Sequence, residues 1–383
     1  MTAPASFTVA GDRLTLLTEG PDRRAALLAL IDGARTSLRV LYYIYADDDA
    51  GRQVNAALLA AAARGVRVAL IVDGFGSDAA SDAHFFDGLR AGGVAVCRFS
   101  PRFGRRYLLR NHQKLALADG EAADAARIIV GGFNVEDDYF ATGPDAWRDL
   151  GLLVEGDAAA RLTGYFDALH DWVQRPRGKV RHLNAALSAW SGTQGPLRWL
   201  IGGPTRGLSP WARTVRADIG AGRRIDIIAG YFTPSPGMLR RLDRAGVQRR
   251  AVRIVTAAKS DNTATIAAAR FTYRGLLGKG VRVFEYGRSK LHTKLYVIDD
   301  TVQIGSANFD MRSLFLNLEL MLRIDDPAFA AFARDYVDGE CGGSDEITLA
   351  NYRARTGWWQ RVKQFASYLV VAVIDPGVSR GVN

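Results

Sequence analysis

Apolar and polar positions alternate in long blocks along the first third of the chain. Residues 38–46 (LRVLYYIYA) form a continuous apolar run typical of a buried strand, and residues 55–65 (NAALLAAAARG) predict a helix that ends at a glycine. Residues 66–77 predict a second strand and a Gly-rich loop, followed by a short helix over 85–93 and a strand over 94–99. This β-α-β-α-β order predicts a mostly parallel or mixed sheet that is covered by helices.

The same pattern returns in the second half of the chain. Residues 224–232 (RIDIIAGYF) match residues 38–46, and residues 281–286 (VRVFEY) match residues 94–99. Self-similarity of this kind indicates two homologous structural units. We therefore expect an α/β protein with two halves, each containing a sheet that is flanked by helices.

Composition divides the chain into four parts. Residues 1–180 and 216–340 carry the two repeated units, and the Gly-, Ser- and Pro-rich stretch 181–215 is predicted to connect them. The last part, 341–383, combines basic residues with a Trp pair and an apolar run that is too short to span a bilayer. Two interpretations stay open for this tail: a helix packed on the core, or a segment at a membrane interface.

The composition of the 383-residue chain is globular and basic. Its 48% hydrophobic and 23% charged residues exclude a disordered or fibrous protein, and its two cysteines exclude a disulfide framework and a Cys-based zinc site. The formal net charge of +10 indicates an anionic partner: nucleic acid, an anionic membrane surface or a phosphorylated small molecule. Neither a signal peptide nor a membrane-spanning helix is expected from the sequence.

Each half contains a His-x-Lys pair, an Asp five residues after the Lys, and a Gly-rich turn that ends in Asn. The candidate site residues are His112, Lys114, Asp119 and Asn134 in the first half and His292, Lys294, Asp299, Ser306 and Asn308 in the second. The chain has only five histidines and seven lysines. Two such pairs at equivalent places of a repeat therefore exceed what chance supplies.

The spacing places each histidine and its lysine on the same face of a strand. The two halves would then pool two imidazoles, two ammonium groups and two amides in one active site at their interface. The ammonium and amide groups suit a phosphoryl group, and two imidazoles suit a two-step displacement with one nucleophile and one acid and base. No metal or other cofactor is expected, because the sequence offers no carboxylate cluster to bind one.

An imidazole in this role needs a carboxylate that fixes its tautomer. Asp149 and Glu319 stand at equivalent places, 37 and 27 residues after the histidines of their own halves, and are the candidate orienting groups. Asp119 and Asp299 belong to the catalytic motif, but they sit at strand ends before turns. We expect these two to hold loop geometry rather than to contact substrate.

The motif resembles the phospholipase D signature, HxKxxxxD followed by G-[GS]-x-N, present twice. Further blocks, among them YYIYADDDAGRQV, WRDLGLLVEG and GSANFDMRSLFLNLEL, resemble bacterial cardiolipin synthases of the phospholipase D type over about residues 13–375. The resemblance implies two phospholipase D-type halves and transfer of a phosphatidyl group from phosphatidylglycerol, or a related donor, onto phosphatidylglycerol. It also implies a phosphohistidine intermediate, with His112 as nucleophile and His292 as acid and base.

Two other functions stay open at this point. One is a phospholipase D-type hydrolase or nuclease that uses water as acceptor, and the other is a non-catalytic protein that binds anionic lipid or nucleic acid. Two complete catalytic sets argue against the second.

The basic segments suggest where the protein acts. Five arginines before the first motif are expected to approach lipid headgroups, the alternative being a solvated basic loop: Arg98, Arg102, Arg105, Arg106 and Arg110. The expected partners are anionic phospholipids rather than nucleic acid, with peripheral attachment at the cytoplasmic face of a bacterial inner membrane.

Overall fold

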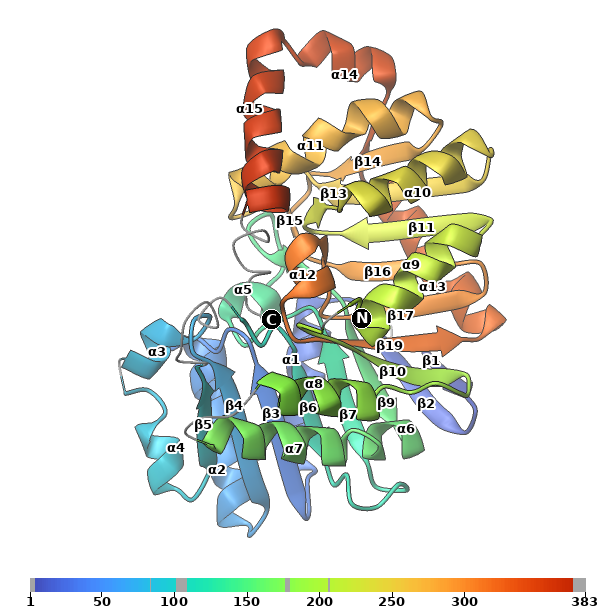
Figure 1. Ribbon diagram of the computed structural model, residues 1–383. Helices are drawn as coiled ribbons and strands as arrows, with labels where there is room; N and C mark the ends of the chain where they lie inside the picture. The colour runs from blue at the N-terminus through green and yellow to red at the C-terminus, as the bar shows by residue number, and fades with distance from the viewer. Residues whose placement is uncertain (1–3, 83, 101–108, 176–179, 206, 375–383) are drawn as a thin grey trace.

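The computed structural model describes residues 4–82, 84–100, 109–175, 180–205 and 207–374, and within them the long strands form two eight-stranded sheets (Figure 1). The first sheet has the order β1 (Ser6–Val9), β2 (Asp12–Leu17), β9 (Gly151–Glu155), β7 (Arg127–Gly131), β6 (Leu115–Ala118), β3 (Ser37–Tyr42), β4 (Arg67–Asp73) and β5 (Ala95–Phe99). The second has the order β10 (Leu197–Gly202), β19 (Glu319–Asp325), β17 (Thr301–Gly305), β16 (Lys294–Ile298), β11 (Arg224–Ala229), β13 (Ala251–Ala257), β14 (Arg282–Tyr286) and β20 (Asp345–Ile347).

The two sheets share one topology, and the predicted fold class of two α/β halves is confirmed. In the first sheet β3, β4 and β5 run parallel and the other neighbours antiparallel, and β11, β13 and β14 repeat this arrangement in the second. The strands predicted at 38–46 and 224–232 are β3 and β11. Each lies in the middle of its sheet. β3 pairs with β6, which directly follows the first His-x-Lys motif, and β11 pairs with β16, which begins with the lysine of the second motif.

Helices cover both sheets. Those of the first half are α1 (Gly20–Asp32), α2 (Asp49–Ala63), α3 (Asp78–Asp82), α4 (Asp87–Ala91), α5 (Asp137–Phe140), α6 (Asp157–Ala160) and α7 (Thr163–Gln174), followed by α8 (Val180–Ala189). Those of the second half are α9 (Pro210–Ala221), α10 (Pro236–Val247), α11 (Thr263–Gly278), α12 (Met311–Phe315), α13 (Pro327–Gly342), α14 (Leu349–Arg355) and α15 (Trp358–Tyr368), which continues into a π-helical turn over Leu369–Ile374. In Figure 1, α9, α10 and α11 lie together in front of the second sheet.

The starts of α9 and α10 follow from their sequences. Ser209 and Ser235 each precede a proline, and each hydroxyl accepts a hydrogen bond from the backbone N–H three residues later. Proline at the first helical position has no N–H to leave unsatisfied, so Ser-Pro is a strong start signal. These two caps fix the starts of α9 and α10.

A single apolar core joins the two halves. It contains fully buried side chains from β6, β7 and β9 of the first sheet together with side chains from β16, β17 and β19 of the second. Burying an aliphatic side chain of this size stabilises the fold by about 1.5–3 kcal/mol. The interface between the halves is therefore as apolar as a domain interior, and it holds the loops at the strand ends in fixed positions.

Two ranges that the sequence suggested to be a connector and a tail contain strands of the second sheet. The range 181–215 contains most of α8 and all of β10, and β10 pairs with β19 as an edge strand of the second sheet. The range 341–383 contains β20, which pairs with β14, and α15, whose Phe365 and Tyr368 rings contact Phe271 of α11. In the part of the chain that the structure describes, no helix is both long and apolar enough to cross a membrane.

Candidate active site

The two His-x-Lys pairs occupy equivalent positions in the two sheets. Lys114 directly precedes β6 and Lys294 begins β16, and each ammonium group donates a hydrogen bond to the backbone oxygen of its own histidine. Lys114 and Lys294 are each 1% exposed, while His112 is 7% and His292 3% exposed. All four side chains are therefore held inside the protein, as expected for reacting groups rather than for solvated surface residues.

The backbone of each histidine is held by the opposite half. The N–H of His112 donates to the oxygen of Leu318 at 2.9 Å, and the N–H of His292 donates to the oxygen of Arg148 at 2.8 Å. The second contact continues a two-residue parallel ladder between β8 (Trp147–Arg148) and β15 (Lys290–Leu291). The residue next in the chain after each of these acceptors is one of the two candidate carboxylates.

The carboxylates consequently pair with the histidines crosswise. Nδ1 of His112 lies 3.1 Å from the carboxylate of Glu319, and Nδ1 of His292 lies 2.7 Å from the carboxylate of Asp149. An ionised carboxylate only accepts hydrogen bonds, so each Nδ1 carries the proton and each Nε2 is left to react. Each imidazole is thus oriented by a carboxylate of the opposite half. In the sequence, by contrast, each carboxylate follows the histidine of its own half.

Side-chain donors surround Glu319, which is fully buried. Its carboxylate accepts from the hydroxyl of Ser306 at 2.5 Å and from that of Ser313 at 2.7 Å, in addition to His112. Burial alone would raise the pKa of Glu319, but the charges and hydrogen bonds of His112 and Lys114 and the Ser306 hydroxyl hold it below its usual value. Glu319 is therefore ionised at neutral pH.

Backbone contacts surround Asp149 instead. Its carboxylate accepts from the N–H of Leu150 at 2.8 Å, and a Cβ built on Gly132 would lie only 2.4 Å from its Oδ1. The buried guanidinium of Arg23 donates to the backbone oxygen of Asp149 at 2.6 Å. Burial opposes ionisation, yet the charges of Lys294, His292 and Arg23 hold the pKa of Asp149 below its usual value.

The two predicted asparagines lie on the turns that follow the next strands. The side-chain oxygen of Asn134 accepts from the backbone N–H of Ile44 at 3.1 Å, which ties its turn to the end of β3. Asn308 is 3% exposed, and its side-chain oxygen has no hydrogen-bond partner among the described residues. A buried amide of this kind is a ready hydrogen-bonding group for a ligand.

Asp119 and Asp299 lie away from the histidines, at the other ends of β6 and β16. The carboxylate of Asp119 accepts from the backbone N–H of Thr36 at 2.7 Å, and that of Asp299 accepts from the N–H of Arg224 at 2.9 Å. Both residues have φ near +50°, in the left-handed region that Asp tolerates in turns. Their contacts hold the loops that lead into β3 and β11, away from the reacting groups.

Aromatic rings line the imidazoles, and sequence reasoning did not single them out. The ring of Tyr43 lies 5.0 Å from that of His112 and 5.1 Å from the ammonium group of Lys114, measured to ring centroids. Tyr139, Trp147 and Tyr231 surround His292 at 5.2–5.8 Å. In the sequence these residues look like ordinary core aromatics, and no sequence signal distinguishes them.

Burial and mutual charge lower the pKa of all four basic groups. Burial and the positive charges of Lys114 and Lys294 lower the pKa of His112 to about 4. Burial and the positive charge of Lys294 lower the pKa of His292 to about 3. Burial lowers the pKa of Lys114 to about 7 and that of Lys294 to about 8. Each histidine responds to the lysine of the other half, so the two motifs form one electrostatic unit.

Most of the basic segment before the first motif lies outside the described residues, including Arg102, Arg105 and Arg106. At its edges, the guanidinium of Arg98 donates to the oxygen of Gly74 at 2.7 Å, and that of Arg110 lies 4.1 Å from the centroid of the Phe75 ring. The expected approach of these arginines to lipid headgroups stays a prediction.

Comparison with known proteins agrees with this geometry. A family model described as cardiolipin synthase, PLD-like domain, matches residues 27–170 and 218–339, which include both His-x-Lys motifs and both carboxylates. The chain belongs to this family. The predicted resemblance to the phospholipase D superfamily is thereby confirmed.

Relatives from this PLD-like family align with most of the chain. A cardiolipin synthase from Geobacillus kaustophilus is 31% identical over 316 residues, 80% of this chain and 61% of that protein. Cardiolipin synthase B from Escherichia coli K12 is 31% identical over 372 residues, 94% of this chain and 87% of that protein. The chain thus spans about three-fifths of the first relative and most of the second.

A solved structure shows the same fold. The phosphatidylserine synthase of Haemophilus influenzae superposes with a TM-score of 0.76 over 94% of this chain and 95% of that chain, at 13% sequence identity. At this identity the likeness concerns the fold alone. Together with the family model, it supports a fold of two PLD-like halves.

Proposed function

We propose that this protein is a phosphatidyltransferase that makes cardiolipin from two molecules of phosphatidylglycerol, through a covalent phosphohistidine. The observation that carries the proposal is the pair of crossed imidazole–carboxylate contacts, with both buried lysines beside them. The two ammonium groups suit the anionic oxygens of a phosphodiester. The unpartnered side-chain oxygen of Asn308 can accept a hydrogen bond from a hydroxyl of the substrate. The names of the relatives supply the phospholipid class.

The reaction requires two displacements at phosphorus. In the first, Nε2 of His112 attacks phosphorus, the bond to the glycerol oxygen of the donor breaks, and His292 gives that oxygen its proton. In the second, a hydroxyl of the acceptor phosphatidylglycerol gives its proton to His292 and attacks phosphorus, and the N–P bond breaks. His112 is restored, His292 is again protonated, and the products are glycerol and cardiolipin.

The two carboxylate contacts favour this division of roles. The shorter contact, 2.7 Å, joins His292 to Asp149 and supports an imidazolium, whereas Glu319 divides its charge between His112 and two serine hydroxyls. Without substrate, burial keeps both imidazoles neutral, and the lysine charges lower the pKa of His292 further. A bound phosphodiester would offset the lysine charges and raise the pKa of His292 toward the protonated form.

Phosphatidylglycerol vesicles offer a direct test with purified protein. Wild-type protein is expected to release glycerol and form cardiolipin, and His112→Ala and His292→Ala are each expected to lose at least about 10³-fold in kcat. The exposed His182→Ala serves as matched control and should keep full activity. Formation of phosphatidic acid alone would replace the transferase with a hydrolase, and cleavage of DNA but not lipid would assign a nuclease.

We also propose that α15 attaches the protein to an anionic bilayer surface. Its inner face is fixed, because the hydroxyl of Tyr368 donates to the oxygen of Pro234 at 3.0 Å and Gln364 accepts from Tyr352. The outer face of α15 and of the π-helical turn that follows it carries apolar side chains that are 38–69% exposed: Trp358, Trp359, Val362, Phe365, Leu369 and Val370. Exposed Arg361 and Lys363 give this apolar stripe the charge that an anionic lipid surface complements.

Vesicle flotation tests this attachment. Trp358→Ser/Trp359→Ser is expected to float at least about tenfold less with phosphatidylglycerol vesicles, because tryptophan side chains supply much of the interfacial binding. Val247→Ser, which removes an apolar side chain that is 61% exposed on α10, is the matched control. Equal flotation of the double variant and the wild type would remove α15 from the attachment surface.

A further inference from the structure

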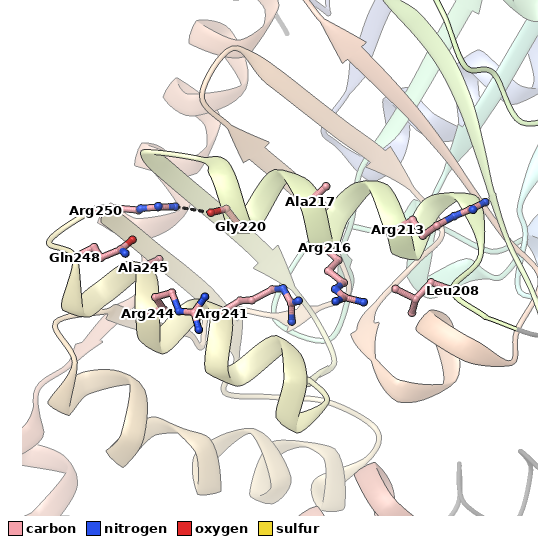
Figure 2. A pocket seen from close by; sticks show the side chains of 10 residues that line it. All are labelled: Leu208, Arg213, Arg216, Ala217, Gly220, Arg241, Arg244, Ala245, Gln248 and Arg250. Atoms are coloured by element: carbon pink, nitrogen blue, oxygen red, sulfur yellow. Dashed lines mark hydrogen bonds between the residues drawn. The ribbon is translucent and has the colours of Figure 1, made fainter.

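A second cationic feature lies on the outer surface of the second half, between α9 and α10. Five arginines line a cleft of about 420 Å³ there: Arg213 and Arg216 on α9, Arg241 and Arg244 on α10, and Arg250 after it. Figure 2 shows the guanidinium groups of Arg216 and Arg241 turned toward one another from the two facing helices. The cleft shares no residue with the crossed imidazole–carboxylate site.

Arg250 has a structural role of its own in this cleft. Its guanidinium donates to the backbone oxygen of Gly220 at 2.8 Å, where α9 ends (Figure 2). It also donates to the backbone oxygen of Gly222 at 2.9 Å. Cations commonly bind the unpaired carbonyl groups at a helix C-terminus. This contact accounts for Arg250. Arg241 also donates to a backbone oxygen, that of Gly237 in its own helix, at 2.9 Å. The guanidinium groups of Arg213, Arg216 and Arg244 form no such bond within the described residues.

The remaining arginines lack a counter-charge on the protein. Within the described residues, none of Arg213, Arg216, Arg241 and Arg244 forms an ion pair with a carboxylate. The acidic residue of α9, Asp218, is engaged by Arg323 and Gln303 of the sheet instead. Burial and the neighbouring positive charges lower the pKa of Arg241, so these guanidinium groups repel one another.

The cleft and the reacting groups lie at opposite ends of the strands of the second sheet. Arg250 directly precedes β13, and α9 ends just before β11 begins, so the cleft borders the start of these parallel strands. Lys294 pairs with Ala229, the last residue of β11. The six residues of β11 separate the two sites by about 17 Å of strand.

We propose that this cleft binds a phosphate-bearing anion with at least two negative charges. Guanidinium groups from two helices match the oxygens of a phosphate group, and each can donate two parallel hydrogen bonds to it. Bringing four uncompensated charges together on two capped helices favours an anion with several charges over a single carboxylate. The chemistry is shared by a soluble polyphosphorylated molecule and by the headgroup of an anionic phospholipid.

Calorimetric titration of the full-length protein with tripolyphosphate tests for the site. Arg216→Ala/Arg244→Ala is expected to bind tripolyphosphate at least tenfold more weakly than the wild type, with an unchanged melting temperature, because both side chains are exposed on helices. Arg13→Ala/Arg90→Ala removes the same charge from exposed positions of the first half and is the matched control. His112→Ala should bind tripolyphosphate as the wild type does.

A second measurement separates the two sources of phosphate. Flotation is measured with vesicles that contain phosphatidic acid, because its phosphomonoester headgroup can carry two negative charges. The Trp358→Ser/Trp359→Ser background is used, so that α15 does not contribute. A lipid headgroup is the ligand if the arginine replacements lower flotation further and tripolyphosphate competes with the vesicles for the protein. A soluble anion is the ligand if the replacements leave flotation unchanged but weaken the binding of tripolyphosphate. Equal binding of both probes by the wild type and Arg216→Ala/Arg244→Ala, or binding of neither probe by the wild type, overturns the proposal.

Discussion

The two carboxylates reach the same kind of contact with an imidazole by different means. Glu319 carries one more methylene than Asp149, and two serine hydroxyls hold it from the sides. The shorter Asp149 is held by the N–H of Leu150, and it comes so close to Gly132 that no side chain fits there. Ser306 of the second half stands at the position of Gly132 in the first. The pair of differences is therefore compensatory: a longer acid goes with a serine, and a shorter acid with a glycine.

This contrast shows that the repeat is symmetric in backbone but not in chemistry. Each imidazole keeps a carboxylate on Nδ1, which the reaction requires of both. The surroundings of the two carboxylates differ, and so does the charge that each can lend to its imidazole. An unequal pair suits a reaction that needs one imidazole as nucleophile and the other as acid.

Replacing the carboxylates should have the largest effect. Asp149→Asn and Glu319→Gln are each expected to lower kcat by about 10³- to 10⁴-fold, because the imidazole loses its tautomer and its support as imidazolium. A lipid with p-nitrophenol as leaving group needs no protonation, so it should restore much of the activity of Asp149→Asn but not of Glu319→Gln. Asp145→Asn, at an exposed position, is the control. Equal rescue of both variants would contradict the assignment of His292 as the acid.

Gly132→Ser should have the next largest effect. Its Cβ would stand 2.4 Å from Oδ1 of Asp149, so the carboxylate must move and His292 with it. A displacement near 1 Å costs about 10²-fold in rate, which steady-state assays of kcat would detect. Gly275→Ser is the control, since a Cβ there meets nothing within 4 Å. Unchanged kcat for Gly132→Ser would show that the glycine is not needed for the shorter acid.

Ser306→Ala and Ser313→Ala should have smaller effects. Each removes one hydrogen bond to the buried carboxylate of Glu319 and one from a backbone N–H, that of Leu320 or Asn308. Each lost bond costs about 1–3 kcal/mol of stability, and we expect about a tenfold loss of kcat. Thermal unfolding and cardiolipin formation measure the two effects. The carboxylate with fewer donors has a higher pKa, so the acidic limb of the pH–rate profile should shift upward. A pH–rate profile identical to that of the wild type would show that these serines do not affect the reaction.

The smallest effect is expected from pH. The pKa values of Lys114 and Lys294, about 7 and 8, mean that both ammonium charges are present below pH 7 and are lost as the pH rises through 8. The value of kcat/KM should therefore fall above about pH 7, by up to about tenfold between pH 7 and pH 8, while kcat changes less because bound phosphate stabilises the charged lysines. A flat kcat/KM profile up to pH 9 would contradict the role of lysine charge in binding.

Much of this arrangement could be predicted from local sequence. The His-x-Lys pair and its repeat at His292 could be read from the sequence, because both are short-range properties of the chain. The predicted placement on one face of a strand differs from the structure, where His112, Lys114 and His292 lie just before β6 and β16 rather than within a strand. The crosswise pairing could not be predicted, because it is set by how the two sheets dock. The same holds for Tyr43 and Trp147, whose apolar character is equally suited to a core.

The strand β10 could not be predicted from the sequence for a related reason. Its residues, Leu197–Gly202, follow a Gly- and Ser-rich stretch that is typical of a linker, and only pairing with β19 stabilises them as a strand. Tertiary pairing of this kind routinely overrides local composition.

The crossing of the contacts has a consequence for how this protein can lose its function. A duplicated unit might be thought to carry a spare, so that damage to one copy leaves the other at work. Here a disturbance that loosens the first half removes Asp149 from His292 at the same time as it displaces His112, and a disturbance of the second half does the converse. Neither copy can act as a reserve for the other, and activity should vanish as a single event whichever half is the first to open.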